Sequence, residues 1–490
     1  MKLDFINKSK IAMCFAILCF CFSPSNVSYA ETLQNIDLNT SESPVKIANC
    51  ECPDKNQVNT EIPAVDIKKT EINEDKNIVP VLDLKGGVQT QEIKKETPVE
   101  IWLNQDTMTG NWNGLRSKAE EHGITVSGSY MLNNFMKEHS GGLLNNSRPS
   151  YQGISNTSIE FNTEKMHLYP GGKLFVQFQN IHGKGLTDKY VGDYMYFNGY
   201  ESSRSGPQLS EYWYEQSLLN DKLKLKIGKQ DANCEFQAIE TGWEFMNSGF
   251  NFISNSLLPT YPNAAMGLTA TIQPTENTYL KYGFFDGNAI GSQSGFNTIF
   301  HKDGSNMNVE EIGITPSIKN HPGKYIFGLW QRSANIDELL NDDQVNAGYS
   351  PITYKSNNGL YTEFEQSIFK ENEKQEDSQG LTIMGQYAWA PKTRTELTKY
   401  FGTALVYQGL IPKRNNDSLG VGINFAQFSN RVGSINSGRV GRKGESVLEV
   451  FYKIALTPWL YIQPDFQYIN KPYYADNSTI VFGVRTNIDF

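Results

Sequence analysis

The chain has 490 residues, a formal net charge of −9, and 39 % hydrophobic and 12 % aromatic residues. The acidic balance argues against a general nucleic-acid-binding protein, and the hydrophobic fraction is low for a membrane protein built from helices. The abundance of Tyr, Phe, Asn and Gly is typical of strands joined by many turns, and the length accommodates one large barrel with an extension.

The N-terminal residues 1–30 predict a secretory signal peptide. Lysines precede a short apolar run at 11–22, and Ser28-Tyr29-Ala30 places small residues at the positions that cleavage requires. That run is too short to span a bilayer as a helix, and no longer apolar run follows it. We therefore expect an exported protein that is either soluble or a β-barrel.

Residues 31–100 predict a largely disordered polar extension. They are rich in Glu, Lys, Asn, Thr and Pro, with only scattered apolar residues, and so bury too little to offset chain entropy. After cleavage Cys50, Cys52 and Cys234 would remain, and an odd number cannot pair completely within one chain. We assign these cysteines no function.

Residues 101–490 predict the barrel domain. The residues from Ser117 to Gly123 predict a short helix that ends at the glycine. Strand-length segments of an antiparallel transmembrane barrel follow, about sixteen in all, an even count that is typical of porins. They lie at about 124–135, 154–163, 172–182, 208–218, 222–230, 264–273, 278–286, 308–316, 324–332, 358–368, 380–390, 397–407, 418–428, 446–457, 459–469 and 478–490.

The last of these segments, 478–490, shows the alternation most clearly. Phe482, Val484 and Ile488 fall on one face of an extended strand, whereas Arg485 and Asn487 fall on the other. A strand with lipid outside and water inside requires this pattern and a closing partner, because no backbone edge is tolerated in hydrocarbon. An edge strand of a soluble sandwich is the alternative interpretation.

Connection lengths alternate as they do in outer-membrane barrels. Joins such as Asn220-Asp221, His321-Pro322-Gly323 and Thr457-Pro458 are short, whereas 187–207 and 230–263 are long. Short turns on one rim and long loops on the other favour a membrane barrel over a sandwich. Aromatic residues near strand ends suit interfacial girdles: Trp459, Tyr473 and Tyr474.

The segment from Leu209 to Gln230 carries the candidate solute contacts. Glu211, Trp213 and Glu215 share one strand face, and Lys224 and Lys226 share a face of the next strand. An indole ring flanked by carboxylates suits a sugar, which stacks its C–H face and donates hydroxyl hydrogen bonds. The alternative is that Trp213 faces lipid and the charges only solvate a wide pore.

The following residues, 234–263, are too aromatic for a freely solvated loop. They include Phe236, Trp243, Phe245 and Phe250. We expect this segment to fold into the barrel and narrow it, with Trp243 as a further pore-lining candidate.

Enzyme signatures are not evident. No P-loop or nucleophile elbow occurs, and the histidines are scattered without metal-ligand spacing. Glu211 and Glu215 lie about 13 Å apart along a strand, too far for the paired carboxylates of a glycosidase. We predict no catalytic residue, no cofactor and no metal.

Several motifs resemble the carbohydrate-selective porin family typified by OprB. They are Gly110-Asn111-Trp112-Asn113-Gly114-Leu115-Arg116 with Gly123-Ile124, Gly141-Gly142, Leu209-Ser210-Glu211-Tyr212-Trp213-Tyr214-Glu215-Gln216, and Leu225-Lys226-Ile227-Gly228-Lys229-Gln230 followed by Phe236. The resemblance covers about 105–490 and implies a sixteen-stranded, passive channel for monosaccharides, glucose above all. The family often has Arg in place of Lys229, and the extension 31–100 is not shared.

The hypothesis is an outer-membrane diffusion channel for monosaccharides, embedded in outer-membrane lipid as a monomer or a homotrimer. Aromatic and charged lumenal groups would replace part of a sugar's hydration weakly enough to release it. A general or ion-selective porin of the same fold is one alternative. A barrel enzyme or a soluble β-rich hydrolase is the alternative from another class.

Overall fold

The computed structural model describes residues 97–201, 205–253, 255–287, 305–372, 378–432 and 443–490, and the backbone of 78–82 and 88–92. The predicted signal peptide, Cys50, Cys52 and most of the predicted extension lie outside the described residues. The chain divides into two units, one of residues 29–105 and one that contains 106–490.

The first unit contains regular elements within the extension predicted to be disordered. β1 (Ile78–Leu82) and β2 (Val88–Glu92) pair antiparallel. α3 (Pro98–Asn104) begins at a capping box, in which the Thr97 side chain accepts from Glu100 N and the Glu100 side chain accepts from Thr97 N. These elements are short and local, and they are consistent with the prediction of a largely disordered extension.

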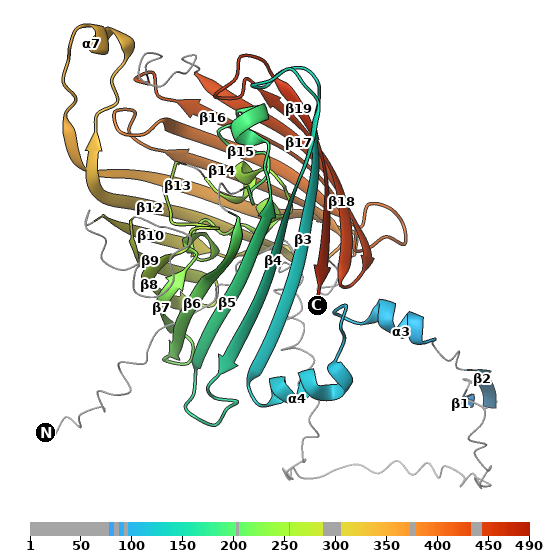
Figure 1. The fold of residues 1–490 in the computed structure, drawn as a ribbon. Helices are drawn as coiled ribbons and strands as arrows, with labels where there is room; N and C mark the ends of the chain where they lie inside the picture. The colour runs from blue at the N-terminus through green and yellow to red at the C-terminus, as the bar shows by residue number, and fades with distance from the viewer. Residues whose placement is uncertain are drawn as a thin grey trace, which may run out of the picture. The chain divides into compact units, whose positions relative to one another are not determined.

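The second unit is a closed antiparallel barrel of sixteen strands, β3–β10 and β12–β19, as the sequence predicts (Figure 1). Each strand pairs with its neighbours in sequence, and β11 (Ser317–Ile318) is a short arm beside β12. The strands are β3 Ile124–Lys137, β4 Arg148–Asn162, β5 Gly172–Gly183, β6 Gly206–Leu218, β7 Leu223–Gln230, β8 Ala265–Thr275, β9 Thr278–Asp286, β10 Asn306–Ile314, β12 His321–Asp337, β13 Thr353–Lys370, β14 Gly380–Trp389, β15 Leu397–Gln408, β16 Ser418–Phe428, β17 Gly444–Thr457, β18 Leu460–Asn470 and β19 Thr479–Asp489.

The seam of the barrel joins β19 to β3, from Val481 opposite Lys137 to Asp489 opposite Ser129. The Gly110–Arg116 motif lies beside this seam. There Met108 N donates to Asp489 O at 2.7 Å and Arg116 Nη2 donates to Phe490 O at 2.8 Å. The Arg116 guanidinium also lies 4.4 Å from the Trp112 ring centre. The motif and the residues just before it therefore hold the end of β19 by hydrogen bonds to its backbone.

Side chains alternate around the barrel as the period-two pattern predicts. On β19, Phe482 and Val484 are exposed on the outer face, whereas Arg485 and Asn487 are buried on the inner face. On β12, Phe327 and Leu329 are likewise exposed. An apolar outer face and a polar inner face are the arrangement that a lipid-embedded barrel needs. No helix in the described part of the chain is long and apolar enough to cross a membrane.

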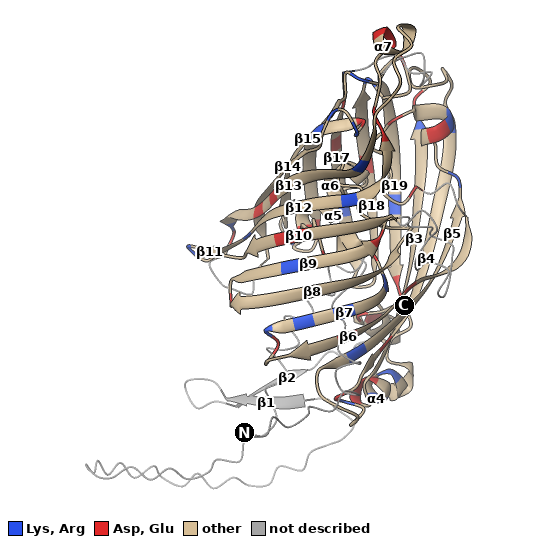
Figure 2. Cartoon of the chain, turned by 90° about the vertical axis from the view of Figure 1, so that its left-hand side faces the viewer, with Lys and Arg blue, Asp and Glu red and all other residues tan. Residues whose placement is uncertain are grey.

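The two rims differ. One rim carries η2 (Trp112–Gly114), α4 (Leu115–Glu121), which the left-handed Gly123 follows, and the short turns. The other carries the long connections and α7 (Asp342–Asn346), whose acidic residues mark the end of the barrel farthest from α4 (Figures 1 and 2). One predicted turn is displaced: His321-Pro322-Gly323 begins β12, and the turn lies at Lys319-Asn320, where both residues have positive φ.

The aromatic girdle prediction is wrong for Trp459 and Tyr473, which are buried. Tyr474 is exposed but lines an interior cavity, so its exposure does not test the prediction. The Tyr473 ring centre lies 4.0 Å from that of Phe428 and 5.2 Å from that of Tyr194, which belongs to the connection between β5 and β6. Packing against that connection therefore takes Tyr473 away from the bilayer.

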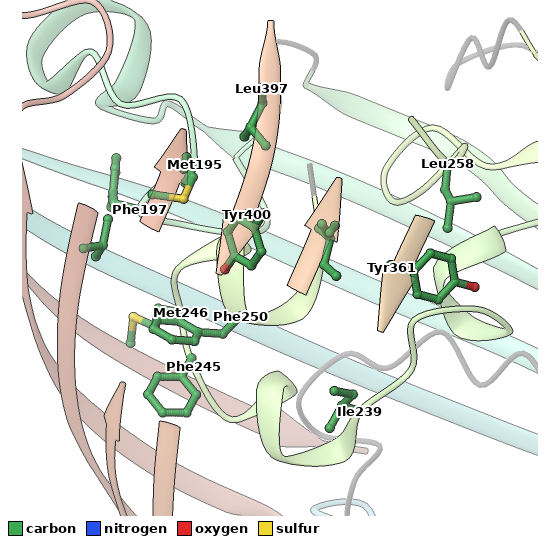
Figure 3. Packing of buried hydrophobic residues seen from close by; sticks show 14 of the residues in the cluster. Met195, Phe197, Ile239, Phe245, Met246, Phe250, Leu258, Tyr361, Leu397 and Tyr400 are labelled. Carbon is green, nitrogen blue, oxygen red and sulfur yellow. The ribbon is translucent and has the colours of Figure 1, made fainter. Parts of the chain in front are cut away.

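The main apolar core lies between the inner faces of the strands and two long connections (Figure 3). The β7–β8 segment, residues 231–264, supplies Phe245, Met246 and Phe250, and holds η4 (Ala232–Cys234), α5 (Glu240–Trp243) and α6 (Ser248–Asn251). The β5–β6 connection, residues 184–205, supplies Met195 and Phe197 and holds η3 (Thr187–Val191). Each fully buried aromatic side chain contributes roughly 1.5–3 kcal/mol relative to exposure, so both connections are firmly packed.

Candidate functional site

Carboxylates on the inner wall hold the backbone of the β7–β8 segment. Glu449 of β17 accepts from Met246 N at 2.5 Å and Asn247 N at 2.9 Å. Along the same segment, three more wall carboxylates each accept a backbone N–H: Glu211 from Asp231 (3.2 Å), Glu311 from Gln237 (3.0 Å) and Glu365 from Thr241 (2.9 Å). A buried backbone N–H left without an acceptor would be unfavourable. This segment is therefore fixed by strands on several sides of the barrel.

A buried group of charges joins the start of the β7–β8 segment to β7 and β9. Lys226 Nζ lies 3.0 Å from Glu235 Oε1, and Lys281 Nζ lies 3.2 Å from Glu235 Oε2. The side chains of Lys226 and Glu235 are only 1 % and 2 % exposed. Removal of one of these charged side chains would leave the charge of its partner buried without compensation, which is unfavourable. The ion pairs therefore hold the start of the β7–β8 segment against β7 and β9.

The predicted face of Glu211, Trp213 and Glu215 points inward, and all three side chains are buried. Trp213 stacks on Phe175 with ring centres 4.7 Å apart, and Lys226 Nζ lies 4.5 Å from the indole centre on β7. Opposite Trp213, Gly228 has φ +142, and a Cβ there would lie 2.5 Å from the Trp213 Cα. The indole is thus enclosed by its neighbours.

The remaining predicted charges lie close to this group. Glu215 is opposite Lys226 on one side and Lys173 on the other. Lys224 is half-buried on the same face of β7 as Lys226. Together with Glu211, they form a mixed-charge wall around Trp213, and the structure brings five of the six predicted residues together there.

Trp243 is separate from that wall and lines a cavity of about 680 Å³. The cavity lies between the β7–β8 segment and the β5–β6 connection, and its size falls within the usual range of small-molecule sites. Aromatic residues are prominent in its lining: Tyr194, Tyr196, Tyr200, Trp243, Phe252, Tyr261 and Tyr474. Trp243, Phe252 and Tyr261 belong to the aromatic segment 234–263 that the sequence predicts to fold into the barrel, and Trp243 was the one named as pore-lining.

The sequence predicts only a long rim loop at 187–207 and does not predict the contribution of the β5–β6 connection. Glu445 of β17 accepts from Tyr194 N at 2.8 Å and Met195 N at 2.9 Å. The connection also meets the β7–β8 segment directly, as Gly199 N donates to Met246 O at 2.8 Å. The density of aromatic residues between Tyr190 and Tyr200 was the available signal.

Two acids of the β5–β6 connection have raised pKa values. Burial raises the pKa of Asp193 to about 6, and burial together with the nearby Asp193 charge raises the pKa of Glu201 to about 8. Both residues line the cavity. Its negative charge therefore increases as the pH rises through these values.

We expect this titration to change ion selectivity. The cation-to-anion permeability ratio should rise between about pH 5 and about pH 9, as Asp193 and Glu201 ionise. Reversal potentials in a salt gradient measure the ratio. Asp193→Asn/Glu201→Gln should flatten the pH dependence, whereas Asp343→Asn, on the exposed rim helix α7, should leave it in place. An unchanged profile in the double variant would show that these acids do not face the ion path.

The described residues contain no group of His, Cys, Asp and Glu side chains arranged to hold a metal. The buried thiol of Cys234 packs with Phe175 and Trp213. Aromatic faces, carboxylates, amides and a few cations line this region, and they suit non-covalent contact with a polar solute.

Comparison with known proteins gives consistent similarities. Residues 148–490 match the family described as carbohydrate-selective porin, OprB family. Porin B of Pseudomonas aeruginosa is 21 % identical over 426 residues, which are 79 % of this chain and 92 % of that protein. Porin AaxA of Chlamydia trachomatis is 23 % identical over 329 residues, 65 % of this chain and 64 % of that protein.

The fold is also similar to a solved structure of Pseudomonas putida OprB at high pH. The TM-score is 0.72 at 19 % identity, and the match covers 79 % of this chain and 99 % of that one. A low-pH structure of the same protein matches over the same shares with a TM-score of 0.52. These likenesses support the barrel architecture.

Proposed function

Because this chain belongs to the carbohydrate-selective porin family, OprB, and its strands close into a sixteen-stranded barrel, we propose that it passes monosaccharides, glucose among them, by passive diffusion through a constriction made by the β7–β8 segment. Family and fold indicate a sugar-selective outer-membrane channel rather than an enzyme. The particular sugar, the constriction and the residues below are the proposal.

The observation that carries the proposal is the set of wall carboxylates along the β7–β8 segment. A segment held at Asp231, Gln237, Thr241 and Met246 by different strands has little freedom to swing aside. A fixed segment inside a wide barrel sets the bore and presents its side chains to passing solutes.

The predicted residues then have two roles in the proposal. Trp243, at the cavity, offers an aromatic face on which the C–H face of a sugar ring can stack. Glu211, Trp213, Glu215, Lys224 and Lys226 form the mixed-charge wall, which supports the segment; the half-buried Lys224 is its most accessible member. The enclosure of Trp213 by Phe175 and Lys226 favours support over solute contact for that indole.

Planar-bilayer recording with purified protein tests this function. Glucose added to one side should reduce the ion current in a saturable way, and Trp243→Ala should weaken this block roughly tenfold, because a lost stacking contact costs about 1.4 kcal/mol. Trp213→Ala should alter the open-channel current more than the affinity for glucose. If glucose does not block the current and a neutral amino acid of similar size permeates equally well in liposome swelling, the channel is a general porin.

A further inference from the structure

The cavity between the β5–β6 connection and the β7–β8 segment is rich in hydrogen-bond acceptors that have no donor. Asp193 Oδ1, Asn233 Oδ1 and Asn251 Oδ1 are all buried, and no described residue donates to any of them. All three residues line the cavity. Because an unmatched buried acceptor is unfavourable, the lining favours a guest that donates hydrogen bonds.

The orientation of the two amides is set by their other ends. Asn233 Nδ2 donates to Phe236 O at 3.1 Å and to Gln237 O at 3.2 Å. Asn251 Nδ2 donates to Phe245 O at 3.4 Å. Because each Nδ2 already donates a hydrogen bond, only the Oδ1 atom of each amide is without a partner among the described residues. Both amides can therefore accept a hydrogen bond from a guest.

The charge of the cavity lining is predominantly negative. It contains Asp188, Asp193, Glu201, Asp231 and Glu396, and its cationic side chain is Arg332. None of the ion pairs between described residues involves Asp193 or Glu201. A small cation that also donates hydrogen bonds would gain from both the charge and the acceptors.

Aromatic faces complete the lining. Tyr200 and Tyr261 meet edge to face with ring centres 5.2 Å apart, and the Arg485 guanidinium lies 5.5 Å from the Tyr200 ring centre. Arg485 already lies against Tyr200, so Tyr261 and Trp243 are the rings that can attract the C–H face of a sugar or an ammonium group.

We propose that this cavity binds protonated amino sugars, hexoses that carry an ammonium group, more tightly than neutral hexoses of the same shape. The inference rests on the proposed function, in that the channel admits sugars, and it names the class that the cavity prefers. The ammonium group would lie toward Asp193, which is largely ionised at neutral pH, and beside Glu201, whose ionisation the bound cation would favour. Ring hydroxyls would donate to Asn233 and Asn251. No bond is made or broken.

The experiment compares three sugars in planar bilayers at neutral pH and low salt: glucosamine, glucose and N-acetylglucosamine. Glucosamine should block the current with a dissociation constant roughly tenfold below that of glucose, equivalent to about 1.4 kcal/mol. N-acetylglucosamine, which lacks the charge, should show no such advantage. Asp193→Asn/Glu201→Gln should remove the preference for glucosamine and leave the block by glucose within a few-fold of the wild type.

Glu201→Gln alone keeps the Asp193 carboxylate that accepts from Phe197 N at 2.5 Å, and it should reduce the preference partly if the double variant fails to fold. Asp343→Asn is the charge-matched control outside the cavity and should keep the full preference. Equal block by glucosamine and glucose in the wild-type channel overturns this inference alone. Loss of the preference in Asp343→Asn would also overturn it, because surface charge would then be the cause. Absence of block by every sugar would instead reject the proposed function.

Discussion

Replacing Glu449 with alanine is expected to raise the single-channel conductance and to add rapid fluctuations between current levels. The change leaves Met246 N and Asn247 N without their acceptor at the centre of the β7–β8 segment. A buried N–H left without its acceptor costs about 1–3 kcal/mol, so the segment should lose much of its anchorage and the glucose block should weaken with it. Planar-bilayer recording measures both quantities.

Two variants serve as controls for this result. Glu449→Gln retains one acceptor oxygen, so its conductance and its glucose block should lie between those of the wild type and of Glu449→Ala. Glu160→Ala removes another inner-face carboxylate, which pairs with Lys173 at 3.4 Å and belongs to β4. Its conductance should stay close to that of the wild type. A Glu449→Ala channel with wild-type conductance would show that the segment does not limit the current.

Replacing Glu235 with alanine is expected to destabilise the folded barrel by about 3–5 kcal/mol, the usual cost of breaking a buried ion pair from one side. The loss leaves Lys226, whose side chain is 1 % exposed, with its charge buried against Trp213. Thermal unfolding in detergent, followed by the shift of the folded species on electrophoresis, measures the effect.

The double variant Lys226→Met/Glu235→Leu distinguishes charge from packing. Replacement of a buried pair by apolar side chains of similar volume is often neutral. Lys281 also loses its carboxylate partner, but its side chain is 18 % exposed and can be hydrated, so this variant should unfold close to the wild-type temperature. Lys173→Ala, which breaks a partly exposed pair with Glu160, should cost less than about 1 kcal/mol. Equal losses in Glu235→Ala and in the double variant would mean that the side-chain shapes, and not the charges, matter here.

Most of the barrel could be predicted from alternation, because the two faces of each strand meet different solvents. On β19 the exposed Phe482 and buried Arg485 lie on the predicted faces, and each predicted strand segment has its counterpart in the closed sheet. Strand ends were less predictable. At β12 and β13 the ladder continues beyond the predicted limits through a bulge near Ser333, where side-chain alternation is interrupted.

The interior could be predicted only in part. The aromatic content of the β7–β8 segment indicated burial, and Trp243 does line the cavity. Alternation places Glu445 and Glu449 on the inner face, but it does not reveal which backbone groups they meet. Those contacts join residues about two hundred and more positions apart, as between Met246 and Glu449 or Tyr194 and Glu445. Such pairings depend on three-dimensional closure and leave no local pattern.

The hydrogen bonds between the Gly110–Arg116 motif and the end of β19 have a consequence for how the barrel folds and inserts into the membrane. Arg116 and Phe490 are 374 positions apart, yet they meet where β3 and β19 close the cylinder. Until β19 pairs with β3, the backbone N–H and C=O groups on the free edge of β3 have no partners, and they can pair with strands of other unfolded chains. Ring closure over such a span is slow. Substitutions at Trp112 or Arg116 should therefore reduce the yield of inserted protein more than the transport rate of the molecules that do mature.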